Sequence, residues 1–300
     1  IIHAHDRMFS PDLYTMHGLP HRLWVRDVRK KRFPSLFDRG TIWVEKRMVT
    51  GGTCRYFLAV SHLTRDIFLR EYPVDPALVP VVHPGIAPED AMETERATKD
   101  TARQALRQRF GLTPEASLII FASMNFDIKG LSALLAGLGR LKIRQPGRPF
   151  HLLVVGGDNR QRYEKEAKAL GIGSHITFTG AVSREELRDI YIAGDLYAML
   201  SKFDTFGMVV LEAMAKGLPV VISANVGAKD LVREGVNGFV IDNPQDADKV
   251  ADVLFQALRK ERLAALGRAA LVTAQEHTWK KTAEQVGAIY DKILAARVAR

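Results

Sequence analysis

Apolar and polar positions alternate in a regular way through the second half of the chain. From about Leu118 onward, short apolar runs of four to seven residues are separated by amphipathic stretches of ten to sixteen residues. This pattern is typical of repeated β-α-β units, in which buried strands form a parallel sheet covered by helices. It predicts strands over 118–123, 150–156, 175–179, 195–200, 219–223 and 238–241. These strands are enough for a complete doubly wound α/β domain.

Leucines between the first two of these strands follow a helical spacing. They recur at intervals of three and four residues, at Leu131, Leu134, Leu135, Leu138 and Leu141. Residues at this spacing lie on one side of a helix, so they form one apolar stripe. We assign this stripe to the core.

The first half of the chain shows a less complete version of the same pattern. Strands are predicted in the segment that runs into His3 and over 13–16, 56–60 and 79–82, with a helix over about 63–71. These elements amount to half of an α/β domain. A further helix is predicted over about 280–297.

The segment after Val82 predicts a domain boundary. Pro84, Gly85 and Pro88 are followed by an acidic stretch without strand character, which is typical of a linker. We therefore expect a partial N-terminal domain over 1–88, a linker over 89–113, a C-terminal domain over 114–279 and a helix over 280–300 that crosses back to the first domain. Because the chain opens at the predicted end of a buried strand, we also expect further residues before Ile1.

Composition and charge narrow the class of protein. The chain has 300 residues, of which 47% are hydrophobic and 26% charged, as in a folded globular protein. No apolar run reaches the roughly 18 residues of a membrane-spanning helix. The single cysteine, Cys54, cannot form an internal disulfide, which favours a reducing, cytoplasmic setting. The formal net charge of +9 favours an anionic partner: nucleic acid, a phospholipid surface or a phosphorylated substrate.

The most informative stretch is 201–221. A strand ends near Ser201, and a helix begins near Gly207, so the loop between them lies at the carboxyl edge of the sheet, where such domains bind ligands. The first amides of this helix, from Gly207, Met208 and Val209, would favour a phosphate group. Asp204 and Glu212 are placed to accept hydrogen bonds from sugar hydroxyls. The alternative is that Asp204 caps the helix and Glu212 is a solvated helix position.

This stretch resembles the signature of the retaining glycosyltransferases of family 4, which have the two-domain GT-B fold. The resemblance rests on an acidic residue, seven further residues and then Glu-Ala-Met-Ala-x-Gly-x-Pro-Val-Val. Other matching motifs follow in the family's order: His-Ala-His-Asp at 3–6, Met-His-Gly at 16–18, Ala-Val-Ser at 59–61, His-Pro-Gly-Ile at 83–86, Lys129-Gly130, Leu-Val-Val-Gly-Gly at 153–157, Ile-Thr-Phe-Thr-Gly at 176–180, Ala-Gly-Asp at 193–195 and Glu-Gly-x-x-Gly-Phe at 234–239. They cover nearly the whole chain.

The resemblance implies roles for the residues of this loop and helix. Glu212 would hold the ribose hydroxyls of the nucleotide, and Asp204 would hold hydroxyls of the donor sugar. The amides from Phe206 to Val209 would hold the sugar and the diphosphate. Most of the family has Glu in place of Asp204, so the shorter side chain leaves the donor sugar open.

Lys129 follows a predicted strand and a short loop, so it faces the same edge of the sheet. A buried diphosphate needs a cation to offset its desolvation and the charge that builds on the leaving group. By the resemblance Lys129 supplies that cation, although the arginine that usually accompanies it is missing from residues 123–128. The alternative is a solvated surface lysine.

Three further positions take their roles from the resemblance. The turn at Gly180 and Val182 would hold the nucleobase through backbone groups, with uridine as the commoner choice of the family. His5 would face the donor sugar and the acceptor, and it shares one strand face with His3. The alternative is a pair of histidines satisfied by the backbone. The histidines and Asp6 do not suggest a metal site, because this fold class uses amides and cations instead.

Residues 24–47 mix aromatic and basic side chains. The basic residues include Arg29, Lys30, Lys31 and Arg32, which suit an anionic membrane or a phosphorylated glycolipid acceptor. No nucleic-acid motif accompanies them. The alternative is a solvated segment with some aromatics buried. With Phe-Pro-Ser-Leu-Phe-Asp-Arg at 33–39 and Trp-Val-Glu-Lys-Arg at 43–47, the segment is similar to the lipopolysaccharide core glucosyltransferase branch of the family.

Together these observations predict a metal-independent, retaining hexosyltransferase of the cytoplasm, peripheral on the inner face of the membrane. It would use a nucleotide diphosphate sugar, a UDP-sugar by the resemblance, as co-substrate and no separate cofactor. Its acceptor would be a glycolipid or polysaccharide such as the lipopolysaccharide core. Two alternatives stay open: a non-catalytic subunit that binds sugar nucleotides, and a sugar-nucleotide epimerase of the same fold.

Overall fold

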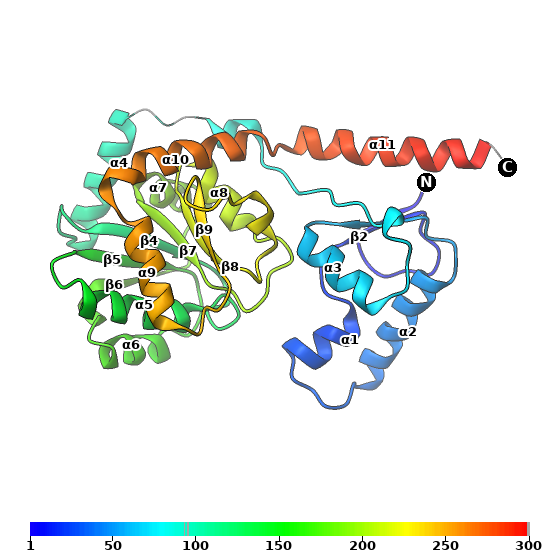
Figure 1. Ribbon diagram of the computed structural model, residues 1–300, viewed down its shortest axis with the longest axis horizontal. Coiled ribbons are helices and arrows are strands. Elements are labelled where there is room, and N and C mark those ends of the chain that lie inside the picture. Colours follow the sequence, from blue (N-terminus) through cyan, green and yellow to red (C-terminus); the bar gives the residue numbers. More distant parts are fainter. Residues whose placement is uncertain (93, 95, 299–300) are drawn as a thin grey trace. The chain divides into compact units, whose positions relative to one another are not determined.

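The protein is described here by a computed structural model that covers residues 1–92, 94 and 96–298. Contacts divide the chain into two compact units, Ile1–Gly85 with His277–Arg300 and Ile86–Glu276. Both units are drawn in Figure 1. Each contains a parallel sheet, and this confirms the predicted α/β fold class.

The first unit contains a three-stranded parallel sheet of order β1-β2-β3. Its strands are β1 (His3–Ala4), β2 (Leu13–Met16) and β3 (Tyr56–Ala59). These three strands match the predicted ones. The predicted strand over 79–82 is wrong, because only Val81 forms a bridge, to Ala59. Pro80 lacks the amide hydrogen that a longer ladder would need.

Helices cover the first sheet, and most belong to the first half of the chain. They are α1 (His21–Leu23), the π-helical turn η1 (Trp24–Val28), α2 (Leu36–Thr50), α3 (His62–Glu71), the short η2 (Pro76–Leu78) and α11 (Trp279–Val298). Ser35 and Asp38 begin α2 with a reciprocal capping box, which satisfies the first amides of that helix.

The C-terminal helix α11 completes the core of the first unit. Ile289 and Ile293 pack against Leu13 of β2 and Leu58 of β3. Both isoleucines are buried. The helix expected over 280–300 therefore contributes its apolar side to the sheet that the first 85 residues build.

The second unit contains a six-stranded parallel sheet of order β6-β5-β4-β7-β8-β9. Its strands are β4 (Ser117–Ala122), β5 (Phe150–Val155), β6 (Ile176–Gly180), β7 (Leu196–Met199), β8 (Val220–Ser223) and β9 (Gly238–Ile241). All of the predicted strands are confirmed to within a residue or two. The chain winds outward from β4 in one direction and from β7 in the other, so the order reverses between these two central strands.

Helices surround this sheet, as Figure 1 shows. They are α4 (Arg96–Phe110), α5 (Leu131–Arg144), α6 (Arg160–Ala169), α7 (Arg184–Ala193), α8 (Met208–Ala215), α9 (Ala247–Ala257) and α10 (Lys260–Gln275), with short turns η3 (Pro88–Ala91), η4 (Gly173–His175) and η5 (Gly227–Leu231). The helix α5 packs against α6 and α9, and α8 packs against α10. The leucine stripe of α5 is fully buried, as predicted.

The segment 89–113 differs from the predicted linker. It carries α4, which packs against α7 as part of the second unit. Arg103 of α4 donates to the carbonyl of Ala193 and pairs with Asp195, which fixes the helix near the start of β7. Residues 93 and 95 of the expected linker lie outside the described part of the chain.

None of the helices in the described residues combines the length and the apolar character needed to cross a bilayer.

Candidate active site

The reversal of strand order places two loops side by side at the carboxyl edge of the second sheet. One loop follows β4 and leads into α5, and the other follows β7 and leads into α8. The carboxyl ends of parallel strands at such a reversal form a crevice, which is where open α/β sheets bind ligands. Each loop carries one of the charged residues that the sequence singled out, Lys129 and Asp204.

Lys129 and Asp204 are in contact. The ammonium group of Lys129 donates a hydrogen bond to Oδ2 of Asp204 and forms an ion pair with it. The amide of Lys202 donates to the carbonyl of Ile128 at 2.7 Å, and so does the hydroxyl of Ser201 at 2.9 Å. These bonds join the loop after β4 to the loop after β7, so the two charges are held together by backbone as well as by their own attraction.

The loop after β7 aims the start of α8 at the same place. Gly207 precedes α8 in a left-handed conformation with φ of 89°, which a residue with a side chain rarely adopts. The amide of Phe206 donates to Oδ1 of Asp204 at 3.3 Å. Because the first amides of a helix have no partner inside the helix, those of Met208 and Val209 can bind an anion there.

Residues of the following turn fix this loop. Asp204 donates through its amide to the carbonyl of Asn225 at 2.9 Å and accepts from the amide of Gly227 at 3.0 Å. The carbonyl of Phe206 accepts from the amide of Ala228 at 2.7 Å. A rigid loop of this kind holds the carboxylate and the helix start in a defined geometry before any ligand arrives.

Glu212 lies in the second turn of α8 and is half-buried. Burial raises the pKa of its carboxyl, the positive charge of Arg184 lowers it, and the carboxylate of Asp90 raises it. Burial also raises the pKa of Tyr197 in β7 well above its ordinary value, and the carboxylates of Asp204 and Glu212 both add to that rise. Asp204 and Glu212 lie on the loop and on the helix that follow β7.

Tyr191 of α7 is a residue that the sequence did not single out. Its hydroxyl is buried and has no hydrogen-bond partner among the described residues. Burial and the charge of Glu212 raise the pKa of this phenol. Nothing in the local pattern of α7 distinguishes Tyr191 from an ordinary core tyrosine, so only the tertiary structure reveals it beside Glu212.

Gly180 and Val182 lie at the end of β6, at the same edge of the sheet and two strands away from β4. The carbonyl of Gly180 accepts from the amide of Gly156 at 2.9 Å, and Gly180 adopts a positive φ of 76°. Val182 is half-buried in the turn before α7. The structure therefore places the predicted nucleobase turn apart from the Lys129–Asp204 pair, but on the same edge.

His5 belongs to the first unit, where it follows β1. Its Nδ1 lies 2.9 Å from Nε2 of His17, and its ring stacks on that of His3 with centroids 4.4 Å apart. The predicted common face of His3 and His5 is confirmed. His3 is held by Tyr290 and Thr15, each at 2.7 Å, whereas the side chain of His5 is exposed. Burial, with the nearby His5, lowers the pKa of His3 to about 4.

The basic segment of the first unit is partly structural. Arg29 donates to the buried Asp38 at 2.8 Å, and His21 contacts the same carboxylate at 3.0 Å. The guanidinium of Arg29 is therefore engaged inside the unit, whereas Lys30, Lys31 and Arg32 are exposed. The aromatic side chains nearby are mostly exposed, with Phe33 and Phe37 each at 76% and Trp43 at 60%.

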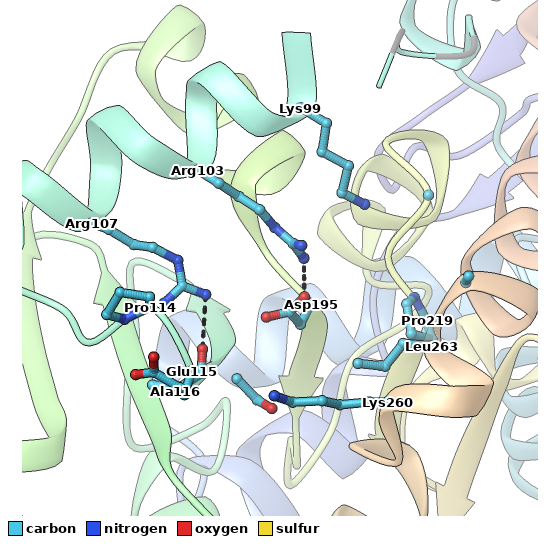
Figure 2. A pocket seen from close by; sticks show the side chains of 13 residues that line it. Lys99, Arg103, Arg107, Pro114, Glu115, Ala116, Asp195, Pro219, Lys260 and Leu263 are labelled. Atoms are coloured by element: carbon cyan, nitrogen blue, oxygen red, sulfur yellow. Dashed lines mark hydrogen bonds and ion pairs between the residues drawn. The ribbon is translucent and has the colours of Figure 1, made fainter. Parts of the chain in front are cut away.

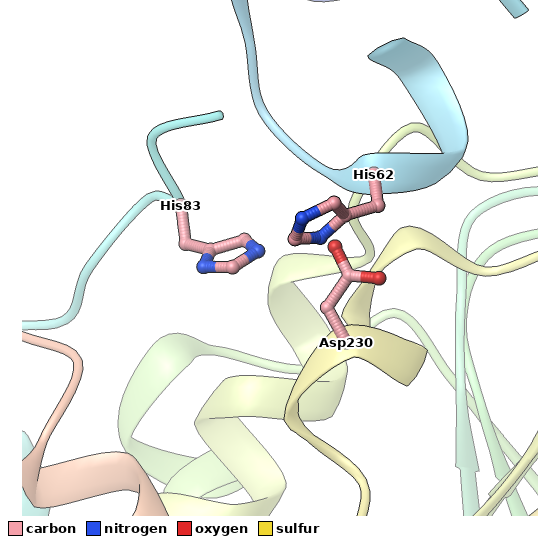
Figure 3. A group of neighbouring side chains, drawn as sticks. All are labelled: His62, His83 and Asp230. Carbon is pink, nitrogen blue, oxygen red and sulfur yellow. The ribbon is translucent and has the colours of Figure 1, made fainter. Parts of the chain in front are cut away.

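Three histidines lie near the points where the chain leaves and re-enters the first unit. His62 begins α3, and its ring centroid lies 6.0 Å from that of His83, which in turn lies 5.9 Å from that of His277. Figure 3 shows His62 and His83 side by side. Asp230, also drawn there, belongs to η5 of the second unit.

The doubly wound sheet, the Lys–Asp pair at its point of reversal and the helix start beside it define an α/β protein whose sheet edge is suited to an anionic ligand. A comparison with family models matches residues 102–272, more than half of the chain, to Glycosyl transferases group 1. The chain belongs to this family.

Curated relatives support the assignment over most of the chain. The D-inositol 3-phosphate glycosyltransferase of Segniliparus rotundus is 30% identical over 294 residues, which is 95% of this chain and 62% of that protein. The mannosylfructose-phosphate synthase of Agrobacterium fabrum is 26% identical over 299 residues, 94% of this chain and 63% of that protein. This chain thus spans about half to two thirds of the length of the curated relatives it matches.

Solved structures share the fold. WaaG, a glycosyltransferase involved in lipopolysaccharide biosynthesis, superposes with a TM-score of 0.76 at 22% identity, over 96% of this chain and 76% of its own. Alr3699/HepE of Anabaena in complex with UDP and glucose gives a TM-score of 0.72 at 21% identity, over 93% of this chain and 71% of its own. These are GT-B glycosyltransferases, as the sequence predicted for the fold.

Proposed function

We propose that this chain is the greater part of a retaining glycosyltransferase that moves a hexose from a nucleotide diphosphate sugar, with UDP-sugar as the donor class. The observation that carries the proposal is the contact between Lys129 and Asp204 beside the first amides of α8. This arrangement offers a cation and backbone donors for a diphosphate, and a carboxylate for sugar hydroxyls. Glu212 would hold the ribose, and the turn at Gly180 and Val182 the base.

The chemistry follows from how charge moves during transfer. The bond between the anomeric carbon and the diphosphate oxygen breaks, and a bond from the acceptor oxygen forms on the same face of the sugar. The acceptor proton passes to an oxygen of the leaving diphosphate. Lys129 and the amides of Met208 and Val209 would offset the negative charge on that group, so we propose that the reaction needs no divalent metal. The carboxylate of Asp204 already accepts from Lys129, which favours binding over nucleophilic attack.

His5 is our candidate for the acceptor side. Its imidazole is exposed at the carboxyl end of the first sheet and keeps its orientation through His17. A neutral imidazole in this position could orient the acceptor hydroxyl or the transferring sugar. Its role is as a positioning residue for the acceptor.

We propose a glycolipid or polysaccharide acceptor such as the lipopolysaccharide core, reached from the cytoplasmic face of an anionic membrane. The exposed Lys30, Lys31 and Arg32 beside Phe33 and Phe37 support this acceptor class, because basic and aromatic side chains together suit a charged lipid surface. A second candidate is a small phosphorylated acceptor, since the names of the relatives include inositol 3-phosphate and fructose phosphate.

Donor binding and turnover test the proposed site directly. Lys129→Ala should weaken UDP-sugar binding at least about tenfold and slow transfer with it, as expected for a lost charged contact to a diphosphate. Calorimetric titration with UDP-sugars measures binding, and release of UDP in the presence of candidate acceptors measures transfer. The activity should persist in EDTA.

Lys202→Ala is the matched control, because Lys202 is an exposed lysine at the same edge that pairs with Asp127. It should change donor affinity less than about twofold. Unchanged binding in Lys129→Ala would reject the site. Donor binding without UDP release would instead indicate the non-catalytic subunit, and conversion of the donor without an acceptor would indicate an epimerase.

A further inference from the structure

The second unit has a cavity at the edge of its sheet opposite to the Lys129–Asp204 pair. Ser117 begins β4, and Asp195 and Pro219 directly precede β7 and β8, so the cavity lies at the amino ends of the central strands. Its volume is about 380 Å³, which falls within the roughly 300–1,000 Å³ of typical ligand sites. Figure 2 shows it from close by. The six residues of β4, at about 3.3 Å each, separate its floor from the other edge by about 20 Å.

Positive charge dominates the lining of this cavity. Lys99, Arg103 and Arg107 recur every four residues along α4, so they share one face of that helix. Lys260, the first residue of α10, faces them across the cavity (Figure 2). The lining contains two carboxylates, Glu115 and Asp195, against these four cations. Counted over the described residues, the formal charge of the lining is therefore +2.

The two arginines are fixed by the protein itself. Arg103 pairs with Asp195 and donates to the carbonyl of Ala193 at 3.1 Å. Arg107 donates to the carbonyl of Ala116 at 2.9 Å. By contrast, the ammonium groups of Lys99 and Lys260 have no carboxylate or carbonyl partner within the described part of the chain. In Figure 2, Lys99 extends from α4 above the Arg103–Asp195 pair and Lys260 extends below that pair from the opposite side.

Gathering these cations is unfavourable without a ligand. Burial and the charge of Arg103 lower the pKa of Lys99, and burial and the charge of Arg107 lower the pKa of Arg103. Asp100 of α4, which does not line this cavity, opposes both of these shifts. An anion between the lysines would remove the repulsion and recover their lost solvation.

A second cavity adjoins the first and widens the space available to a ligand. It has a volume of about 540 Å³ and shares Lys99, Gly217, Leu263 and Ala264 with the basic cavity. Its other lining residues combine two further cations, Lys216 and Arg268, with the apolar side chains of Met92 and Leu271. A phosphorylated molecule with a body larger than the phosphate group itself would fit the two cavities together.

We propose that the basic cavity binds the phosphate group of a small phosphorylated metabolite, at a site distinct from the proposed donor crevice. The charge, the volume and the ordered arginines favour phosphate, since guanidinium and ammonium groups together match its several oxygens. The proposal does not depend on the transferase activity, because none of its residues belongs to the donor crevice.

Titration calorimetry of the whole chain with pyrophosphate tests this site. Since the donor crevice can also bind pyrophosphate, the measurement is made in the Lys129→Ala background. There, adding Lys99→Gln and Lys260→Gln should weaken pyrophosphate binding at least about tenfold, because each removes a cation that no carboxylate among the described residues pairs with. Adding Lys165→Gln, an exposed lysine of α6, is the control and should change the dissociation constant less than about twofold.

Binding that is unaffected by the double lysine substitution would overturn the proposal, and so would the absence of pyrophosphate binding in the Lys129→Ala background. A second measurement needs no substitution of the cavity. Acetylation of Lys99, followed by mass spectrometry, should slow at least about threefold with saturating pyrophosphate, while that of Lys165 should not. Equal rates with and without pyrophosphate would also reject the site.

A comparison of ligands then distinguishes the two sources of a phosphate group. Glucose 6-phosphate and inorganic phosphate are titrated under the same conditions. Tighter binding of the organic phosphate supports the proposed metabolite and use of the adjoining cavity. Equal or tighter binding of inorganic phosphate would overturn the metabolite assignment and leave a site for the free ion.

Discussion

Lys129 and Asp204 lie 75 positions apart in the chain, and each has an ordinary local explanation when considered alone. A loop lysine can be solvated, and an aspartate before a helix can cap it. Their contact depends on two loops that meet only because β4 and β7 are neighbours at the point where the strand order reverses. The pairing is therefore a property of the fold, although the residue types and their loops were predicted from the sequence.

Glu212 provides a test of this site at the scale of one residue. Its pKa in the folded protein is raised by burial, so between the ordinary and the raised pKa the folded state holds more protons than the unfolded state. Stability contributed by this carboxyl is consequently lost as the pH rises through that window. Glu212→Gln should have a higher Tm than the wild type at pH 7. The difference in Tm should be smaller at pH 4, and thermal unfolding at the two pH values measures it.

The same substitution should weaken UDP-sugar binding, because a neutral amide is a poorer acceptor for ribose hydroxyls than a carboxylate. Opposite effects on stability and binding are typical of a group retained for function. Glu164→Gln on α6, an exposed position, should leave both Tm and donor affinity unchanged. A loss of Tm at pH 7 in Glu212→Gln would contradict the account of a carboxyl that burial disfavours.

At the scale of elements, the junction between β4 and α5 depends on Gly130. This residue precedes α5 with φ of 77°, and an added Cβ would lie 1.9 Å from the carbonyl oxygen of Leu200. Gly130→Ala should lower the free energy of unfolding by more than about 1 kcal/mol, because it combines backbone strain with a steric clash. It should also weaken donor binding by moving Lys129. Chemical denaturation and donor titration measure the two effects.

Gly147→Ala is the control for this substitution. An added Cβ there meets nothing within 4 Å, and the residue does not have a positive φ. Its unfolding free energy should stay within about 0.5 kcal/mol of the wild-type value. If Gly130→Ala lowered the free energy of unfolding no more than Gly147→Ala does, the close approach of the loop to Leu200 would be wrong.

Helix α4 is an element that the local sequence pattern did not predict. Its sequence is rich in charged residues, and among the described side chains of that helix Leu106 alone is buried. A predicted linker was the natural interpretation of such a stretch. The helix is instead held by polar contacts with residues almost 100 positions later, such as that between Arg103 and Asp195, which the spacing of apolar residues does not show.

At the scale of the whole molecule, the net charge of +9 and the exposed aromatics of the first unit support the proposed membrane contact. Substituting Phe33→Ser together with Phe37→Ser should reduce binding to vesicles of phosphatidylglycerol at least about tenfold, because two apolar contacts with the lipid are lost. Wild-type binding should weaken in high salt and be poor on phosphatidylcholine vesicles. Vesicle co-sedimentation measures each of these effects.

Ile143→Ser is the matched control, since Ile143 is 70% exposed on α5 of the second unit. Its vesicle binding should equal that of the wild type. Binding that does not distinguish the anionic from the neutral vesicles, or that survives loss of both phenylalanines, would remove the membrane contact from the proposed function.

The sequence by itself determined the strands of the second sheet, the buried stripe of α5 and the family of the protein, because each depends on local periodicity or on short motifs. Only the tertiary structure decided that Lys129 meets Asp204, that Arg29 is engaged by the buried Asp38, and that four basic side chains from α4 and α10 surround one cavity. Each of these arrangements joins different elements of the fold, such as the loops after β4 and β7 or the helices α4 and α10. Their energies arise from burial and charge in the folded state, so local periodicity does not show them.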